Sequence, residues 1–347
     1  MEYTYEDFLN EFVNLMKANL SQYGMEVSIV NKMRNNGIIE KCIKVDIPGC
    51  NMSPSIGTLS LYEHYREYDD VEEMAQGLSE KIIADRNRKI DTMSVLSKEN
   101  ILNSTYLMVV NAASNKELLA ETPHYFIAEG ELAVIPRLNI DIENGRTGTI
   151  IIKNGLLPKL QMTGDEILQV AKINTSGQNL FEINSLLSVT MQMMTDNGED
   201  IADDFSEFFT ESTPKAFVVT NKDKKLGACC LACPEVIGTA IEKMGIDCYI
   251  IPSSIHEVIL VEKGGGSEDL EYLRDCVNQV NRQSVPAAEI LSDKVFVYNQ
   301  KTRKIEIART RTPRRDHQIP QPPIRLYQRH RGHCPKIRHA GAVFPHS

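Results

Sequence analysis

The stretch from Lys215 to Val261 constrains the fold most, because it is the densest run of β-forming residues in the chain. Two apolar runs, Ala216 to Thr220 and Leu226 to Ala232, flank a polar turn and predict a β-hairpin. Pro234 favours the first turn of a helix, where its missing N–H costs nothing, and Gly245 is a natural end for that helix.

The end of this stretch holds the best candidate for a central strand. Cys248 to Ile251 predicts one strand, and His256 to Val261 predicts the next after a break at Pro252. Beyond its first two residues the second strand is apolar on both faces, which is typical of a strand buried on both sides.

The segment after Val261 completes the pattern. Ser267 is a suitable N-cap for a helix that runs to Arg282, and Lys294 to Tyr298 with Lys304 to Ala308 predicts a final hairpin. The order from Lys215 is therefore ββαββαββ. Helices among short strands with hairpin-like turns favour an α+β fold with a mainly antiparallel sheet.

The N-terminal region predicts a helix, a hairpin and two more helices. Thr4 to Tyr23 has apolar residues at helical spacing and a capping pair at its start. Glu26 to Met33 and Ile38 to Val45 flank the sequence RNNG, which favours a tight turn because Asn and Gly tolerate positive φ. Leu59 to Tyr68 and Val71 to Arg88 predict the two further helices.

The middle of the chain carries weaker signals. Thr105 to Asn111 predicts a strand, and Thr163 and Glu166 have capping-box spacing before a helix from Asp165 to Asn174. Phe181 to Thr195 predicts another helix, followed by a strongly acidic linker over residues 196–213. We expect an N-terminal region over 1–104, an α+β domain over 105–308 and a tail over 309–347.

Composition is that of a globular protein. The apolar fraction of 42% and the charged fraction of 24% allow a sizeable core. No apolar run is long enough to span a bilayer, and the N-terminus lacks the layout of a secretion signal. Eight cysteines at irregular spacings do not form a disulfide framework, so we expect reduced thiols, a cytoplasmic location and no membrane partner.

The tail differs from the rest of the chain. From Arg309 onward the tail has nine Lys and Arg residues and one acidic residue, which gives it a net charge of +8. Because the whole chain has a net charge of −9, the rest of the chain carries −17. The acidic body argues against nucleic-acid binding, because phosphate contacts need clustered cations.

The tail itself has three interpretations: a basic arm for nucleic acid or membrane, a metal tract, or a disordered segment unrelated to function, such as a shifted reading frame. The metal tract would use His330, His333, Cys334 and His339. We favour the third because the composition changes abruptly.

The first candidate site is formed by Ser254, His256 and Glu257, with Ser253 beside them. A serine activated by histidine needs a hydrogen bond to the ring and a carboxylate that orients it. In an extended chain Ser254 and His256 point to one side and Glu257 to the other, so these three cannot form a triad by themselves. A histidine that is simply hydrogen-bonded near a strand edge is the plainer interpretation.

The second candidate is the thiol cluster of Cys229, Cys230 and Cys233, with Cys248 further on. Zinc needs four ligands, and the partner of this C-x-x-C pair is missing. A redox motif would place its first thiol exposed at a helix N-terminus. We therefore expect small buried core side chains. No glycine-rich phosphate loop or nucleotide motif is present, and we expect no cofactor.

The run from Leu226 to Val261 resembles a bacterial domain-of-unknown-function family encountered in anaerobic gut bacteria, on the sequence LGACCLACPEVIGTAIEKMGIDCYIIPSSIHEVILV. The segments GCNMSPSI, TGDEILQVAKINT and LSDKVFVYNQKTRKIEI fit the same family. The second half is also faintly similar in layout to YtpQ-type proteins. The resemblance covers the chain to Ile307 and implies a soluble intracellular protein without an assigned reaction, cofactor or catalytic residue.

Two functions remain open at this point. The first is a non-enzymatic, cytosolic binding or accessory protein with a protein partner. The alternative is a hydrolase-like enzyme in which His256 meets a serine or cysteine brought from elsewhere by the fold.

Overall fold

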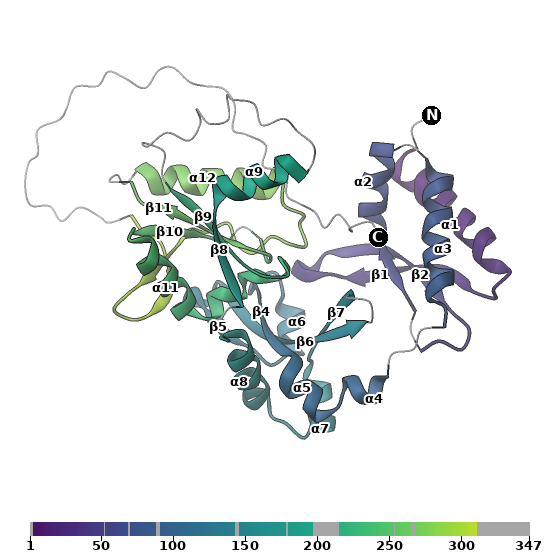
Figure 1. Cartoon of the computed structure of the whole chain (residues 1–347), viewed down its shortest axis with the longest axis horizontal. Coiled ribbons are helices and arrows are strands. Elements are labelled where there is room, and N and C mark those ends of the chain that lie inside the picture. Colours follow the sequence, from purple (N-terminus) through teal and green to yellow (C-terminus); the bar gives the residue numbers. More distant parts are fainter. Residues whose placement is uncertain are drawn as a thin grey trace, which may run out of the picture. The chain divides into compact units, whose positions relative to one another are not determined.

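The computed structural model describes residues 3–51, 53–68, 70–87, 91–142, 146–177, 180–196, 215–252, 254–264 and 268–310 (Figure 1). Contacts group the chain into two compact units. The first comprises residues 1–105, 138–150 and 159–161, and the second comprises 106–137, 151–158 and 162–347. The division into 1–104, 105–308 and a tail stays a prediction. The tail from residue 311, Ser267 and all of the predicted acidic linker 196–213 except Asp196 lie outside the described residues.

Helix α1 (Tyr5–Ser21) organises the first unit. Oγ1 of Thr4 accepts a hydrogen bond from the backbone N–H of Asp7 over 3.3 Å, which is the predicted cap. Its apolar face is fully buried against α2 (Thr58–Tyr68) and α3 (Val71–Asp85). The buried residues of this face include Phe8, Phe12, Met16 and Leu20.

A three-stranded antiparallel sheet lies in the same unit, in the order β1 (Glu26–Met33), β2 (Ile39–Asp46) and β3 (Ser55–Gly57). The turn between β1 and β2 is the short 3₁₀ helix η1 (Asn35–Gly37), where φ is +62° at Asn36 and +66° at Gly37. The predicted hairpin and its turn chemistry are confirmed. Strand β1 is at the edge of this sheet.

Residues 105–151 form a four-stranded sheet in the order β4-β6-β5, with β7 paired to β6. Its strands are β4 (Thr105–Asn111), β5 (Tyr125–Ile127), β6 (Leu132–Ile142) and β7 (Arg146–Ile151). The capping box of Thr163 and Glu166 is present at the start of helix α8 (Gly164–Thr175). The short helices here are α4 (Thr92–Val95), α5 (Lys98–Ser104), α6 (Lys116–Ala120), η2 (Ala128–Gly130), η3 (Asn154–Leu156), α7 (Leu157–Leu160) and α8 (Gly164–Thr175).

The second unit is built on a six-stranded sheet in the order β13-β12-β10-β11-β9-β8, and all five of its pairings are antiparallel. The predicted α+β class is therefore confirmed. The strands are β8 (Phe181–Ser185), β9 (Ala216–Asn221), β10 (Cys248–Ile251), β11 (Val258–Glu262), β12 (Phe296–Asn299) and β13 (Lys304–Ile307).

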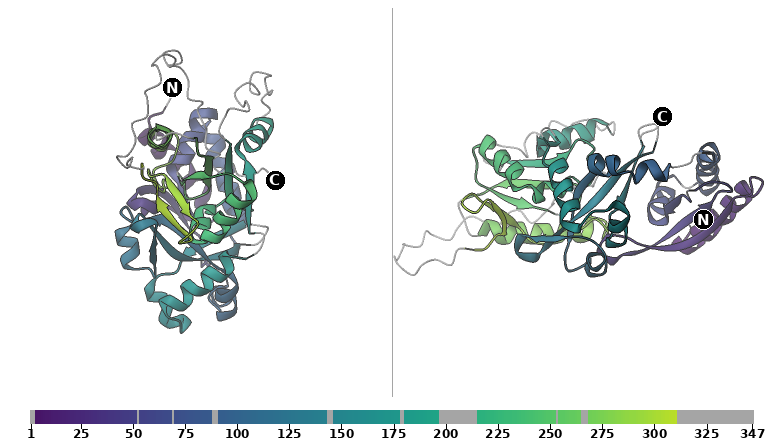
Figure 2. Two further views of the ribbon diagram at one scale, coloured as in Figure 1. Left: turned by 90° about the vertical axis from the view of Figure 1, so that its left-hand side faces the viewer. Right: turned by 90° about the horizontal axis from the view of Figure 1, so that it is seen from below.

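Strand β11 lies between β10 and β9 and is packed on both faces, as the sequence predicts. Val258 and Leu260 belong to the main core, together with α11 (Pro234–Met244). Ile259 packs instead against the cluster formed by α12 (Glu268–Gln283). The two helices lie on opposite faces of the sheet (Figures 1 and 2). Alternation along a strand sends successive side chains to opposite faces, which is why an unbroken apolar run fits here.

The expectation of a strand over Leu226–Ala232 is wrong. This run forms the 3₁₀ helix η4 (Gly227–Ala232), and all six of its residues are buried. Its first two N–H groups, those of Gly227 and Ala228, donate to the carbonyl oxygens of His256 and Ile255 over 2.9 and 3.2 Å. A short apolar run has the same pattern in a buried strand and in a buried helix, so periodicity could not separate them. The predicted order ββαββαββ is therefore wrong at its second strand, where the chain forms a 3₁₀ helix.

Two further boundaries differ from expectation. Phe181 to Thr195 is not one helix: β8 pairs with β9, and α9 (Leu186–Asp196) follows. The backbone N–H of Ser188 donates to Oγ of Ser185 over 3.1 Å, a cap that marks the true helix start. The strand predicted from His256 begins at Val258. None of the helices in the described part of the chain has the length and apolar character needed to cross a bilayer.

Candidate functional site

The segment between β10 and β11 carries the histidine singled out from the sequence. Ser254 is 1% exposed, and its Oγ accepts a hydrogen bond from the backbone N–H of His256 over 2.8 Å. The serine hydroxyl thus accepts from the histidine main chain. Ser253, the other serine considered, lies outside the described residues.

Both nitrogens of the His256 ring have partners. Nδ1 accepts from the backbone N–H of Leu226 over 3.2 Å, so the neutral ring carries its proton on Nε2. Nε2 lies 3.5 Å from Oε1 of Glu289, a half-buried carboxylate. Within the described residues these contacts leave neither ring nitrogen bonded to a serine hydroxyl or a cysteine thiol.

Glu289 is the residue that sequence reasoning missed. It lies 33 positions after His256 in the sequence, in the loop before β12, and no local motif connects the two. Its backbone carbonyl also accepts from the N–H of Ile255 over 2.9 Å, which ties the two loops together. Glu257, the carboxylate predicted beside the histidine, is half-buried in the bend before β11.

The backbone around the ring is closely packed. The carbonyl oxygen of His256 accepts from the N–H of Gly227 over 2.9 Å and from Oγ1 of Thr220 over 2.8 Å. Leu226 has a left-handed φ of +57°, which turns the chain into η4 and aims its N–H at Nδ1. These hydrogen bonds connect His256 to Leu226 and Gly227 at the start of η4 and to Thr220 near the end of β9.

The thiols of Cys229, Cys230 and Cys233 are all buried, the first two within η4 and the third just after it. Burial raises the pKa of Cys229 to about 12, although the charge of Arg137 acts in the opposite direction. Burial likewise raises the pKa of Cys230 well above its ordinary value. The three thiols are therefore neutral at physiological pH and are poor nucleophiles.

One of these thiols has a serine hydroxyl group as its neighbour. Sγ of Cys233 lies 3.4 Å from Oγ of Ser176. Among the residues that the structure describes, no group of three or more His, Cys, Asp or Glu is arranged to hold a metal ion. The arrangement provides small polarisable side chains that fill the core beneath the six-stranded sheet.

A separate feature lies on the β1–β2 hairpin of the first unit. Met33 and Ile39 are directly opposite each other across the two strands and are 57% and 68% exposed. Ile29, on the same face of β1, is 42% exposed. We call these three residues the hairpin patch. The same face is buried further along, where Val27 pairs with Val45, so the patch extends a core face into solvent.

Comparison with known proteins gives a match at the level of a family. The model of DUF5688, a family of unknown function, matches residues 5–300 of the chain. The predicted resemblance to a domain of unknown function is confirmed, whereas the occurrence in gut bacteria and the likeness to YtpQ-type proteins stay predictions. No curated protein matches the chain, and no solved structure does.

Proposed function

Because the chain belongs to the DUF5688 family, whose description names no reaction, we propose from its geometry that it is a non-enzymatic binding protein. Its partner is a second protein, which contributes an extended segment to the edge of the β1–β2–β3 sheet. The same proposal places the protein in the cytoplasm. That location is supported by the seven cysteines of the described residues, none of which forms a disulfide.

The observation that carries this proposal is the exposure of the hairpin patch. Met33 and Ile39 are cross-strand neighbours, and more than half of each side chain is exposed to solvent. A pair of large apolar side chains that continues a buried sheet face is a typical protein-binding surface. Single exposed apolar residues are common, but Met33 and Ile39 are exposed as a cross-strand pair, and Ile29 lies on the same face beyond the Asn31–Lys41 pair.

The edge position of β1 suggests how the partner binds. Strand β1 is eight residues long, and β2 occupies one of its two sides in the three-stranded sheet. An added strand would pair its backbone with the other side of β1 and place alternate side chains beside Ile29 and Met33. We therefore expect a partner segment with two apolar residues four positions apart, one beside Ile29 and one beside Met33.

The proposal is tested by replacing Met33 and Ile39 together with lysine in the full chain. A photo-crosslinking residue at Lys32, an exposed neighbour, identifies the partner in the native cell. The double variant should lose the crosslinked and co-purified protein while it keeps its melting temperature, because both side chains are exposed.

A matched control is Ile173→Lys, which places a charge at another exposed isoleucine, 63% exposed, on α8. This variant should retain the partner. If the partner is recovered equally well with the double variant, or is lost equally with the control, the hairpin patch is not its binding surface.

The contacts of the His256 ring do not favour a hydrolase. It requires a ring nitrogen of His256 next to a nucleophile, and the ring instead contacts the N–H of Leu226 and the carboxylate of Glu289. A hydrolytic activity that disappears in His256→Ala while the fold persists would favour the enzyme over the binding protein.

A further inference from the structure

The second unit contains a pocket of about 430 Å³ beside α6 and β5. Its wall is largely apolar, with Leu119 and three alanines, and its ionisable members are Lys116 and His124. Small-molecule sites are typically of this size and combine an apolar lining with a few polar groups that fix orientation. The pocket is distant in sequence from the hairpin patch and independent of it.

The hydrogen bonding of His124 decides what its ring can offer. Nδ1 lies 2.8 Å from the carbonyl oxygen of Thr122. A carbonyl oxygen only accepts, so Nδ1 must carry the proton. In the neutral ring Nε2 is then a fixed acceptor, suited to a ligand group that donates a hydrogen bond.

An aromatic wall completes the lining. The rings of His124 and Phe126 are 5.1 Å apart between centroids and meet edge to face at 76°. Phe126 is nevertheless 56% exposed, which is high for a large aromatic side chain in a packed pair. The pocket therefore presents an uncovered aromatic surface next to a hydrogen-bond acceptor and to the cation of Lys116.

The backbone at the rim of the pocket has an uncommon conformation that contacts with other segments hold in place. Gly130 lines the pocket, and the two residues before it, Ala128 and Glu129, have left-handed φ values of +51° and +59°. Non-glycine residues in this region are uncommon, and consecutive ones persist only where the surroundings fix them.

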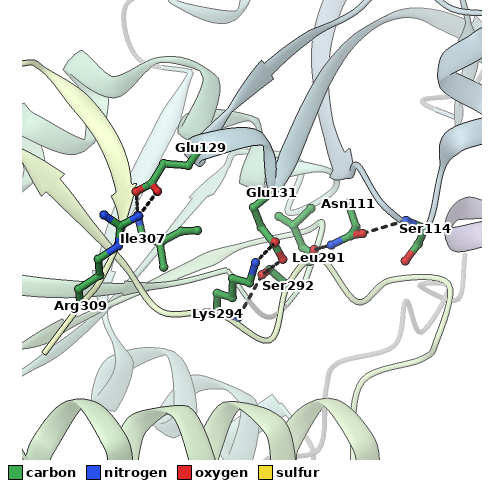
Figure 3. Close-up of polar contacts among 9 residues, drawn as sticks. All are labelled: Asn111, Ser114, Glu129, Glu131, Leu291, Ser292, Lys294, Ile307 and Arg309. Atoms are coloured by element: carbon green, nitrogen blue, oxygen red, sulfur yellow. Dashed lines mark hydrogen bonds and ion pairs between the residues drawn. The ribbon is translucent and has the colours of Figure 1, made fainter.

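Figure 3 shows what fixes this turn. Glu129 accepts from the N–H of Ile307 over 3.2 Å and pairs with Arg309. On the other side of Gly130, Glu131 accepts from Oγ of Ser292 over 2.7 Å and pairs with Lys294. We call these contacts the C-terminal clasp.

The neighbouring part of the rim, where the N–H of Ala112 donates to the carbonyl oxygen of Glu131 over 3.0 Å, is held by Asn111. Its side-chain amide donates to the carbonyl oxygen of Leu291 over 3.1 Å, and its Oδ1 accepts from the N–H of Ser114 over 3.0 Å (Figure 3). The residues between Asn111 and Ser114 line the pocket. Both turns of the rim are thus fastened to the C-terminal segment, and a binding site fixed before the ligand arrives saves the free energy of ordering it.

We propose that this pocket binds a small single-ring aromatic carboxylate that also carries a hydroxyl or amino hydrogen-bond donor. Lys116 pairs with the carboxylate, Phe126 and Leu119 contact the ring, and Nε2 of His124 accepts from the donor. The carboxylate pairs with the positive charge of Lys116, and the aromatic ring of the ligand packs against the exposed ring of Phe126.

The test is calorimetric titration of the full chain with 4-hydroxybenzoate, benzoate and phenol. We expect one saturable site for 4-hydroxybenzoate, with about tenfold weaker binding of each of the other two probes, since each lacks one polar contact. Saturable binding of none of the three, or equal binding of 4-hydroxybenzoate and benzoate, would overturn the proposal.

Three variants connect the binding to the named side chains. Lys116→Gln should weaken 4-hydroxybenzoate and leave phenol unchanged, whereas Lys159→Gln, at an exposed lysine on α7, should change neither. His124→Phe keeps a ring but removes the acceptor, so it should abolish the preference for 4-hydroxybenzoate over benzoate. Phe126→Ala should weaken all three probes.

Melting curves of each variant show whether its fold persists. A preference for 4-hydroxybenzoate that survives in folded His124→Phe would contradict the assignment of the acceptor. These readouts do not involve the hairpin patch, so failure here and failure of the proposed protein partner are separate results.

Discussion

The backbone N–H of Gly227 donates a hydrogen bond to the carbonyl oxygen of His256 over 2.9 Å. A Cβ atom at Gly227 would lie 2.5 Å from that oxygen and 2.4 Å from Oγ1 of Thr220. Such distances are inside van der Waals contact, and two of the atoms that a side chain would meet belong to the backbone. The loop that holds His256 therefore fits against η4 only if residue 227 is glycine.

Gly227→Ala should lower the free energy of unfolding by about 2–4 kcal/mol, because the methyl group forces two buried loops apart. Urea denaturation measures the change. Gly77→Ala is the control: a Cβ at Gly77, inside α3, meets nothing within 4 Å and should raise stability by about 0.5–1 kcal/mol through helix propensity. Equal effects of the two substitutions would refute the close fit.

The stability of the protein should fall at alkaline pH. The pKa of Cys229 is raised to about 12 in the folded state and that of Cys248 to about 11, both chiefly by burial. The unfolded thiols ionise near pH 9, so the stability that these groups contribute is complete below pH 9 and is lost as the pH rises toward 11 to 12.

The expected loss is about 1.4 kcal/mol for each pH unit and each thiol within that window. Urea denaturation at several pH values between 8 and 10.5 measures it. Cys229→Ala should show a shallower decline than the original chain, and identical slopes would show that the buried thiol is not the cause.

Alkylation should separate the cysteines by burial. In the native protein iodoacetamide should react with Cys50 and Cys276, which are partly exposed, and in urea with the buried thiols as well. Mass spectrometry of the peptides identifies the modified positions. Rapid modification in the native state of any buried thiol would contradict the description of the core. The buried thiols are Cys42, Cys229, Cys230, Cys233 and Cys248.

The hydroxyl group of Tyr125 is a buried polar atom with no hydrogen-bond partner among the described residues, and burial raises its pKa to about 12. Tyr125→Phe should leave stability unchanged or raise it by up to about 1 kcal/mol, because an unpaired group is removed. Tyr5→Phe, which removes a 2.6 Å hydrogen bond to Thr58, should lower stability by about 1 kcal/mol. In a spectrophotometric pH titration, the tyrosine ionisation at the highest pH should be missing from the Tyr125 variant and present in the Tyr5 variant.

The two carboxylates of the C-terminal clasp should differ in strength. The side chain of Glu131 is 16% exposed, so Glu131→Gln should cost about 1.5–3 kcal/mol through its charged hydrogen bonds to Ser292 and Lys294. The ion pair of Glu129 with Arg309 is more exposed, and Glu129→Gln should cost less than about 1 kcal/mol. Urea denaturation of both variants gives the comparison, and the reverse order would refute it.

The elements that the sequence predicts correctly are those specified by neighbouring residues. The turn at Asn36 and Gly37 needs only two residues that tolerate positive φ, and the capping box needs only Thr163 and Glu166. The central position of β11 follows from an apolar run on both faces.

The misses depend on contacts that are distant in sequence. The run from Leu226 is helical because its N–H groups reach the carbonyls of residues 255 and 256, and Phe181 is in a strand because β9 lies beside it. Glu289 reaches His256 from a loop that no local pattern connects to it. Such partners are set by the tertiary fold, and a single sequence read by its local patterns does not reveal them.

The final hairpin β12–β13 places Phe296 and Ile305 in the main core and pairs β12 with β10. During translation, the body of the second unit therefore emerges from the ribosome before the strands that complete it. Until those residues arrive, β10 has an open edge and Ile250 lacks its neighbour Phe296. A product that stops short of residue 296 would expose this surface and become a substrate for chaperones and proteases.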